Sequence, residues 1–231
     1  MRKLILLAIL IACAAPMTFA QTTSDYPSVE FFAGYSNARV DNTGGDEDLD
    51  FGVPGTITSN SDFFNNERVG FHGFQASLIG NVHRNVGIKG DVSGHFKSED
   101  ASVTFTPTGG TSVTQNFQTK ARLYNVLGGP EFKARNTSAV TPWAHALFGI
   151  AHANVEFSAT TGPFAGLSES DSDTGFAMAF GGGLDFRASN RVSVRASADY
   201  NPTFLGNDNS TTLNRSNRQD NLRFSIGLLF H

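Results

Sequence analysis

The chain has 231 residues, a formal net charge of −4 and one cysteine. Only 16% of its residues are charged, against about 25% in a typical soluble domain, whereas 39% are hydrophobic and 21 are phenylalanine. This composition excludes a disordered chain and a disulfide framework, and the lack of a basic excess argues against a nucleic-acid partner.

The N-terminal segment predicts export from the cytoplasm. A basic start precedes a short apolar run and a small-residue cleavage site that ends at Ala20. This is the pattern of a secretory signal peptide, because a spanning helix needs roughly 20 apolar residues. We therefore expect residues 1–20 to be a signal peptide and 21–231 to form one domain. In an alternative reading, the lipobox-like sequence 10–13 makes Cys13 the acylated first residue.

Further along, apolar and polar residues alternate with a period of two, as they do in β-strands. The alternation is clearest between Phe176 and Phe186, where even positions are large and apolar and odd positions are small or charged. Each strand therefore has one apolar and one polar face. The eight candidate strands cover residues 28–36, 69–82, 85–97, 115–133, 140–157, 174–187, 191–201 and 221–231.

Two of these strands are expected to contain a β-bulge that exchanges their faces. In 69–82 the aromatic residues change parity across Gly73, and in 115–133 they change across the Gly-Gly-Pro sequence at 128–130. Glycine in a strand often marks such a bulge. In 140–157 large apolar residues occupy both parities, so the pattern assigns no face to this strand.

The connections between the strands alternate in length. Two- to four-residue turns follow the second, fourth and sixth strands, whereas polar connections of 16 to 32 residues cover 37–68, 98–114, 158–173 and 202–220. An up-and-down barrel places all the tight turns at one end, which is the asymmetry of outer-membrane barrels. A closed barrel also leaves no unpaired sheet edge in hydrocarbon. The sequence therefore predicts an all-β fold, an eight-stranded antiparallel up-and-down transmembrane β-barrel with its apolar faces toward lipid.

The polar faces of the strands would line the interior of this barrel. Eight strands leave an interior just wide enough for side chains, and buried charges there have to be paired. We therefore predict a lumen charge network that plugs the barrel, formed by Lys89, Asp91, Asp185, Arg195, Asp199 and Arg223.

Aromatic residues gather near the strand ends, which is typical of the two membrane–water interfaces. A lower, periplasmic belt is expected from Tyr26, Phe132, Trp143, Phe186 and Phe230. An upper, extracellular belt is expected from Tyr35, Phe71, Phe96, Phe117, Phe157, Phe176 and Phe204.

Three segments carry a family resemblance: Tyr-Asn-Val-Leu-Gly-Gly-Pro-Glu-Phe at 124–132, Thr-Pro-Trp-Ala-His-Ala at 141–146, and Phe-Gly-Gly-Gly-Leu-Asp at 180–185. On these segments the chain resembles the outer-membrane β-barrel domain family, which is related in fold to the OmpA transmembrane domain. The resemblance implies a barrel in a Gram-negative outer membrane, with a surface or porin-like role and without the peptidoglycan-binding domain of full OmpA proteins.

The same resemblance implies that the barrel assembly machinery inserts the chain. Such barrels commonly finish on an aromatic residue that this machinery recognises. Ser225, Gly227 and Phe230 match most of that assembly signal, although His231 follows the aromatic residue.

The sequence offers little support for other chemistry. The acidic loop 46–52 echoes a calcium site, but Ile57 stands where the bidentate glutamate belongs. His145 and His152 are separated by an odd number of residues, so they face opposite sides of one strand and share no metal. No Ser/His motif marks a nucleophile with its base. We expect no catalytic residue, no metal and no cofactor.

Together these features predict an integral outer-membrane barrel, a monomer without enzymatic activity, with a structural or surface-interaction role through its long extracellular loops. Its expected partners are outer-membrane lipid, lipopolysaccharide and the barrel assembly machinery. Two alternatives stay open. One is a narrow porin-like channel for small solutes, and the other is a soluble secreted barrel whose apolar faces point inward around a lipophilic ligand.

Overall fold

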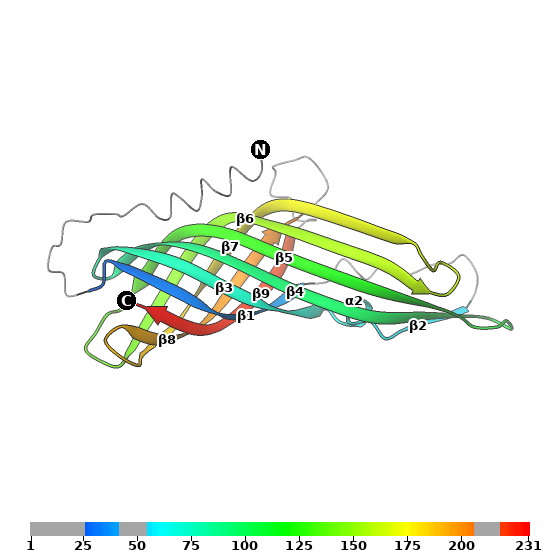
Figure 1. Cartoon of the computed structure of the whole chain (residues 1–231), viewed down its shortest axis with the longest axis horizontal. Coiled ribbons are helices and arrows are strands. Elements are labelled where there is room, and N and C mark those ends of the chain that lie inside the picture. The colour runs from blue at the N-terminus through cyan, green and yellow to red at the C-terminus, as the bar shows by residue number, and fades with distance from the viewer. Residues whose placement is uncertain (1–25, 42–54, 206–217) are drawn as a thin grey trace.

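The computed structural model describes residues 26–41, 55–205 and 218–231. The expected signal peptide with Cys13 and the acidic loop 46–52 lie outside these described residues. Within the described ranges, long antiparallel strands form one elongated barrel (Figure 1). No described helix is long and apolar enough to cross a membrane.

Eight long strands make the barrel wall, and each pairs with its neighbours around the cylinder. The sheet closes because the first strand pairs with the last, from Phe31 opposite Phe230 to Arg39 opposite Leu222. This arrangement confirms the predicted eight-stranded antiparallel barrel. The strands are β1 (Val29–Asp41), β3 (Arg68–His83), β4 (Val86–Pro107), β5 (Val113–Lys133), β6 (Val140–Thr161), β7 (Ser168–Arg187), β8 (Val192–Phe204) and β9 (Arg218–Phe230).

Two short elements lie in the connection between β1 and β3. Strand β2 (Gly55–Ser59) adds to the far end of β4, where Thr58 is opposite Thr104. The single helical turn α2 (Asp62–Asn65) follows, and Ser61 caps it by accepting a hydrogen bond from the backbone N–H of Phe63. This long connection therefore carries some regular structure of its own.

The seam between β1 and β9 depends on two glycines. Gly34 is opposite Gly227, and both positions face the barrel interior. A Cβ added to Gly34 would lie 2.4 Å from the carbonyl oxygen of Ile226, and one added to Gly227 would lie 2.4 Å from the Cα of Gly34. The two strands can approach this closely because neither position carries a side chain.

The two faces of the wall divide as the alternation predicts. Phe180, Leu184 and Ile226 point outward and are 39%, 41% and 55% exposed, while Ala177 and Ala179 on the opposite face of β7 are fully buried. An apolar outer surface around a packed interior is the arrangement that hydrocarbon requires. The alternative with inward apolar faces and a lipophilic ligand is therefore wrong.

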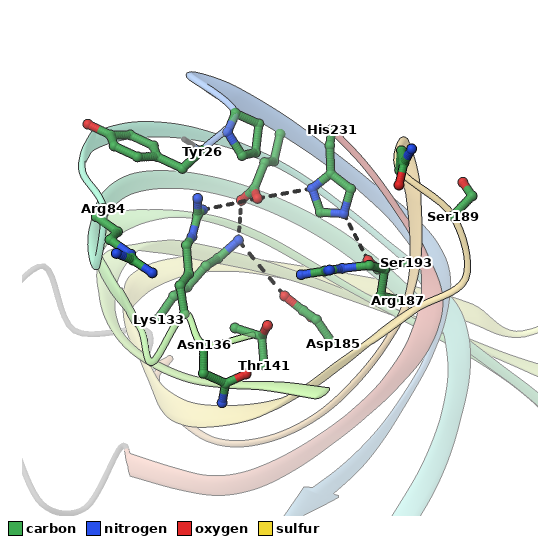
Figure 2. Close-up of a pocket in the computed structure, with 14 residues that line it drawn as sticks. Tyr26, Arg84, Lys133, Asn136, Thr141, Asp185, Arg187, Ser189, Ser193 and His231 are labelled. Atoms are coloured by element: carbon green, nitrogen blue, oxygen red, sulfur yellow. Dashed lines mark hydrogen bonds and ion pairs between the residues drawn. The ribbon is translucent and has the colours of Figure 1, made fainter. Parts of the chain in front are cut away.

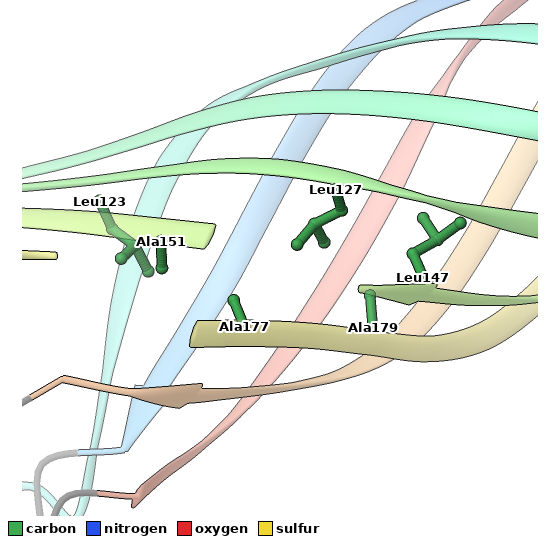
Figure 3. Packing of buried hydrophobic residues seen from close by; sticks show 6 residues of the cluster. All are labelled: Leu123, Leu127, Leu147, Ala151, Ala177 and Ala179. Atoms are coloured by element: carbon green, nitrogen blue, oxygen red, sulfur yellow. The ribbon is translucent and has the colours of Figure 1, made fainter. Parts of the chain in front are cut away.

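The interior also contains large apolar side chains, which the predicted charge network did not include. Leu123 and Leu127 of β5 pack with Leu147 and Ala151 of β6 and with the buried alanines of β7 (Figure 3). A second cluster joins Phe71 of β3 to neighbouring strands. Apolar packing therefore fills part of the lumen beside the ionic part.

Neither expected β-bulge is found within the described strands. The register of β3 against β4 runs unbroken across Gly73, and that of β5 against β4 runs unbroken across 128–130. Odd positions therefore face inward throughout both strands, and this parity brings Phe71 into the interior. The prediction failed because it assumed that aromatic residues always face outward, whereas the interior packs several of them.

Two of the four expected long loops are mostly strand. Strands β4 and β5 continue to Pro107 and from Val113, and β6 and β7 continue to Thr161 and from Ser168, so only short turns join them. These two hairpins project beyond the barrel at one end (Figure 1). Their sequences resemble those of loops because serine, threonine and acidic residues are frequent in them. Ala101, Val103 and Ala159 are nevertheless buried on one face, and threonine and valine favour strands.

Candidate functional site

Arg195 of β8 holds two carboxylates together inside the barrel. Its guanidinium donates hydrogen bonds of 2.7 and 2.8 Å to Asp185 of β7, and of 3.1 and 3.2 Å to Glu131 of β5. The side chain is 1% exposed. The ring of Trp143 lies against it, with its centroid 4.2 Å from Cζ. Paired hydrogen bonds between arginine and carboxylate are strong and directional, so this group is firmly positioned.

Arg223 of β9 makes a second ionic group. It donates hydrogen bonds of 2.9 and 2.7 Å to one carboxylate oxygen of Asp199 on β8, and one of 2.8 Å to Asp91 on β4. Ser93 accepts a further bond of 3.2 Å from the same guanidinium. Asp199 lies on β8, which neighbours β9, whereas β1 and β3 separate β9 from Asp91 on β4, so Arg223 reaches across the lumen to a strand that its own strand does not pair with.

Lys89 of β4 connects the two groups. Its Nζ lies 3.5 Å from a carboxylate oxygen of Glu131 and 3.9 Å from one of Asp91. It also lies 3.2 Å from Nδ1 of His145, whose Nε2 is 3.1 Å from Asp199. The result is one continuous network across the lumen.

The structure brings together all six residues predicted for the lumen charge network, each at most 5% exposed. Sequence reasoning missed several members that complete it. Every one of the eight barrel strands contributes a polar side chain, because β1, β3, β5 and β6 add residues to those on β4, β7, β8 and β9. The missed residues are Glu30, Gln75, Glu131, Lys133 and His145.

The network is balanced in charge. Five basic side chains meet five acidic ones. Lys133 and Arg135 pair with Glu30 near the barrel end, and the other pairs lie deeper. The basic members are Lys89, Lys133, Arg135, Arg195 and Arg223, and the acidic members are Glu30, Asp91, Glu131, Asp185 and Asp199. Such pairing is what makes buried charges tolerable inside a protein.

A cavity of about 550 Å³ opens where the short turns gather, and we call it the turn-end cavity (Figure 2). Glu30 lies at its base, bound by Lys133, by Arg135 at 3.1 Å and by Nδ1 of His231 at 3.1 Å. Nε2 of His231 lies 2.8 Å from the hydroxyl of Ser193. The C-terminal residue is thus part of the cavity wall.

Most residues expected in the aromatic belts lie on the barrel exterior or at its ends. Exposed members are Phe132, Phe186 and Phe230 at the turn end and Tyr35, Phe96 and Phe176 toward the other end. Tyr26, Phe117, Phe157 and Phe204 are partly buried.

The prediction is wrong for two of the expected belt residues. Trp143 is 5% exposed and Phe71 4%, and both lie inside the barrel. The indole of Trp143 is retained there because Arg195 and Lys89 both lie against its ring, the latter with Nζ 4.8 Å from the centroid. Phe71 packs edge-on against Phe63 of the helical turn at 6.3 Å.

An apolar hollow of about 330 Å³ lies on the β6–β7 hairpin, beyond the barrel. The rings of Phe117 and Phe157 pack at its base with centroids 4.5 Å apart. Phe164 and Leu167, in the turn between β6 and β7, are 57% and 62% exposed. Large apolar side chains exposed on a surface feature of this kind often mark an interaction site.

The remaining candidates are separated by the fold. His145 faces inward and His152 outward, where Nδ1 of His152 lies 2.7 Å from the hydroxyl of Thr174. Ser225, of the expected assembly signal, faces inward and donates to Ser36, while Phe230 faces outward and stacks on Phe31. Recognition of these residues by the assembly machinery stays a prediction.

Solved structures of bacterial proteins superpose on most of this chain. The crystal structure of Ail, the attachment invasion locus protein of Yersinia pestis, superposes with a TM-score of 0.51 at 17% identity, over 87% of this chain and 96% of that one. Ail in complex with the heparin analogue sucrose octasulfate gives 0.50 at 17% identity with the same coverage. Neisserial surface protein A gives 0.49 at 11% identity, over 88% and 97% of the two chains. No curated protein sequence matches significantly.

The family comparison covers nearly the whole chain. The outer membrane protein beta-barrel domain matches residues 4–230. Barrels of this kind have short periplasmic turns and longer extracellular loops, so we expect the short turns on the periplasmic side and the projecting hairpins outside the cell. The closed cylinder, its apolar exterior and this match lead to one conclusion: the chain belongs to the outer membrane protein β-barrel domain family.

Proposed function

We propose that this protein is a monomeric, non-enzymatic barrel that does not conduct solutes and acts through its extracellular surface. The observation that carries this proposal is the network of ion pairs and hydrogen bonds across the lumen, to which every one of the eight strands contributes a polar side chain. The apolar cluster around Leu127 and Leu147 occupies further interior space. A lumen filled by charged and apolar side chains acts as a plug.

The extracellular hairpins supply the surface through which the protein would act. The β4–β5 and β6–β7 hairpins project beyond the lipid-facing part of the barrel, and the apolar hollow around Phe157 and Phe164 lies on them. Acidic side chains flank this hollow on β7, namely Glu169, Asp171 and Asp173. Apolar and acidic groups side by side suit a partner in the outer leaflet, and lipopolysaccharide with its divalent cations is the one we propose.

One buried pair of residues, Ser36 and His95, supports the proposed lack of enzymatic activity. Ser36 lies 2.8 Å from Nε2 of His95 and accepts a hydrogen bond from Ser225. This is the arrangement of a nucleophile and its base. Both Ser36 and His95 are completely buried among ionic neighbours, so no substrate reaches the hydroxyl.

Planar-bilayer recording tests whether the lumen is closed. The protein is inserted at neutral pH, and its folding is verified by heat-modifiable mobility on a gel. We expect no conductance steps from the wild-type protein. An R195A/R223A variant that still shows folded mobility should open the lumen and give steps, which proves that the assay detects an open barrel of this size. Steady steps from the wild-type protein would favour the narrow-porin alternative instead.

The surface role needs its own experiment. Folded protein in phosphatidylcholine nanodiscs is titrated with purified lipopolysaccharide in calcium buffer, and then again after chelation. We expect binding that chelation weakens and that the double variant F164S/L167S reduces. The matched control is V113S, because Val113 is an exposed apolar residue on the neighbouring hairpin, away from the hollow. Equal binding by all three proteins would contradict the proposed surface.

A further inference from the structure

The turn-end cavity has a surplus of positive charge. Four basic side chains, Arg84, Lys133, Arg135 and Arg187, line it, against the two carboxylates of Glu30 and Asp185 (Figure 2). It lies at the periplasmic mouth of the barrel, at the opposite end from the projecting hairpins, so a ligand bound here would not depend on the hairpin surface.

Both carboxylates of the cavity are already occupied. Glu30 is bound by Lys133, by Arg135 and by His231. Asp185 accepts two hydrogen bonds from Arg195, and Lys133 lies 3.9 Å from it. Neither acid therefore has capacity to neutralise a further cation.

The surplus positive charge of the cavity belongs to Arg84 and Arg187. Both are exposed, and neither makes an ion pair within the part of the chain that the structure describes. They come from different sides of the barrel, since Arg84 lies in the β3–β4 turn and Arg187 at the end of β7. Figure 2 shows both side chains at the cavity. Two unpaired guanidinium groups at one concave site attract an anion of matching charge.

A third group in the cavity lacks an acceptor. The Nη1 atom of Arg135 is buried and has no hydrogen-bond partner among the described residues, although Nη2 binds Glu30. Buried donors are nearly always satisfied in folded proteins, so an open one at a cavity points to an acceptor that the ligand supplies. Neutral hydrogen-bonding side chains complete the lining, from Asn136, Thr141, Ser189 and Asn190.

We propose that the turn-end cavity is a binding site for a small soluble oxyanion that carries at least two negative charges, such as a phosphorylated solute of the periplasm. Arg84 and Arg187 bind it by charge-assisted hydrogen bonds, and Nη1 of Arg135 supplies a further donor. A volume of about 550 Å³ is in the range of small-molecule sites. The lining residues surround the barrel mouth rather than its lipid-facing side, which favours a soluble anion over a lipid headgroup.

Calorimetric titration with inorganic pyrophosphate tests the site. The full-length mature protein is refolded into phosphatidylcholine nanodiscs, and ionic strength is held constant. We expect saturable binding that weakens about tenfold in each of R84Q and R187Q, because each loses a charge-assisted contact. The matched control is R191Q, which removes an exposed charge at the same end but outside the cavity lining, and which should bind as the wild-type protein does.

Three results would overturn the proposal. The first is no saturable binding of pyrophosphate by the wild-type protein. The second is equal weakening in R191Q, which would show a general effect of surface charge rather than a site. The third is loss of pyrophosphate binding when the nanodiscs contain phosphatidylglycerol, which would assign the cavity to a lipid headgroup. Heat-modifiable mobility of every variant verifies that the barrel is folded.

Discussion

Arg195 and Asp185 lie opposite each other on β8 and β7, and two hydrogen bonds of 2.7 and 2.8 Å join their side chains inside the barrel. Removal of the arginine leaves this carboxylate and that of Glu131 without their main partner. We expect R195M to lower the free energy of unfolding by about 3–5 kcal/mol. Urea titration in lipid vesicles measures the effect.

The control for that measurement is R191M, because Arg191 is exposed and lies outside the network. Its effect should stay within about 0.5 kcal/mol of zero, as for ordinary surface substitutions. Equal unfolding free energies for the two variants would mean that the buried ion pairs contribute nothing to the folded state.

Phe180 tests the lipid-facing surface. It points outward near the middle of β7, so arginine at this position would place a charge in hydrocarbon. We expect F180R to reduce the free energy of folding into lipid by about 2–4 kcal/mol. The matched variant is F164R, in which another exposed phenylalanine, in the turn between β6 and β7, is replaced, and it should be close to neutral. No effect of F180R on the free energy of folding would contradict the placement of β7 in the membrane.

Trp143 is the only tryptophan, so its fluorescence reports its own position. Because it lies inside the barrel against Arg195 and Lys89, neither brominated lipid nor acrylamide should quench it strongly. A variant that carries tryptophan at an exterior position, F132W in a W143F background, should be quenched by the lipid probe. Strong quenching of Trp143 by brominated lipid in the wild-type protein would show that its ring faces lipid, as the aromatic-belt prediction had it.

Gly34 tests the closing seam. The Cβ of G34A would lie 2.4 Å from a backbone oxygen of β9, so the strands have to separate or shift. We expect the free energy of unfolding to fall by about 1–3 kcal/mol, as for overpacked sites. A smaller fraction of the protein should then show the heat-modifiable mobility of the folded barrel on the gel. The control is G80A on the adjoining strand, where an added Cβ meets nothing within 4 Å. If G34A folds as well as G80A, the seam is not held by close approach.

The barrel could be predicted because lipid imposes a simple rule on each spanning segment. In 176–186 every even residue meets acyl chains and every odd residue faces the interior, so the alternation gave the face, the strand and the inward position of Asp185. The same rule located Lys89 and Asp91 on β4. Periodicity was informative wherever one face was uniformly apolar.

The rule failed where an aromatic residue faces inward. Trp143 and Phe71 were expected outside, and the assumed reversal at 128–130 concealed that Glu131 and Lys133 share the inward parity of Leu127. Which large side chain the interior accepts depends on partners from distant strands, such as the two cations against Trp143. Such partners become neighbours only after the cylinder has closed, and periodicity within one strand contains no information about them.

That every strand contributes to one network has a consequence for biogenesis. Arg223, on β9, pairs with Asp91 on β4, which precedes it by 132 residues. The β7–β8 hairpin can pair Arg195 with its own Asp185, but the bonds of Arg223 to Asp91 and of Arg195 to Glu131 join strands that are distant in the sequence. A half-inserted intermediate lacks these long-range pairs, at a cost that only the complete cylinder removes. The ionic interior thereby makes insertion an all-or-none event, and it makes the finished barrel slow to come apart.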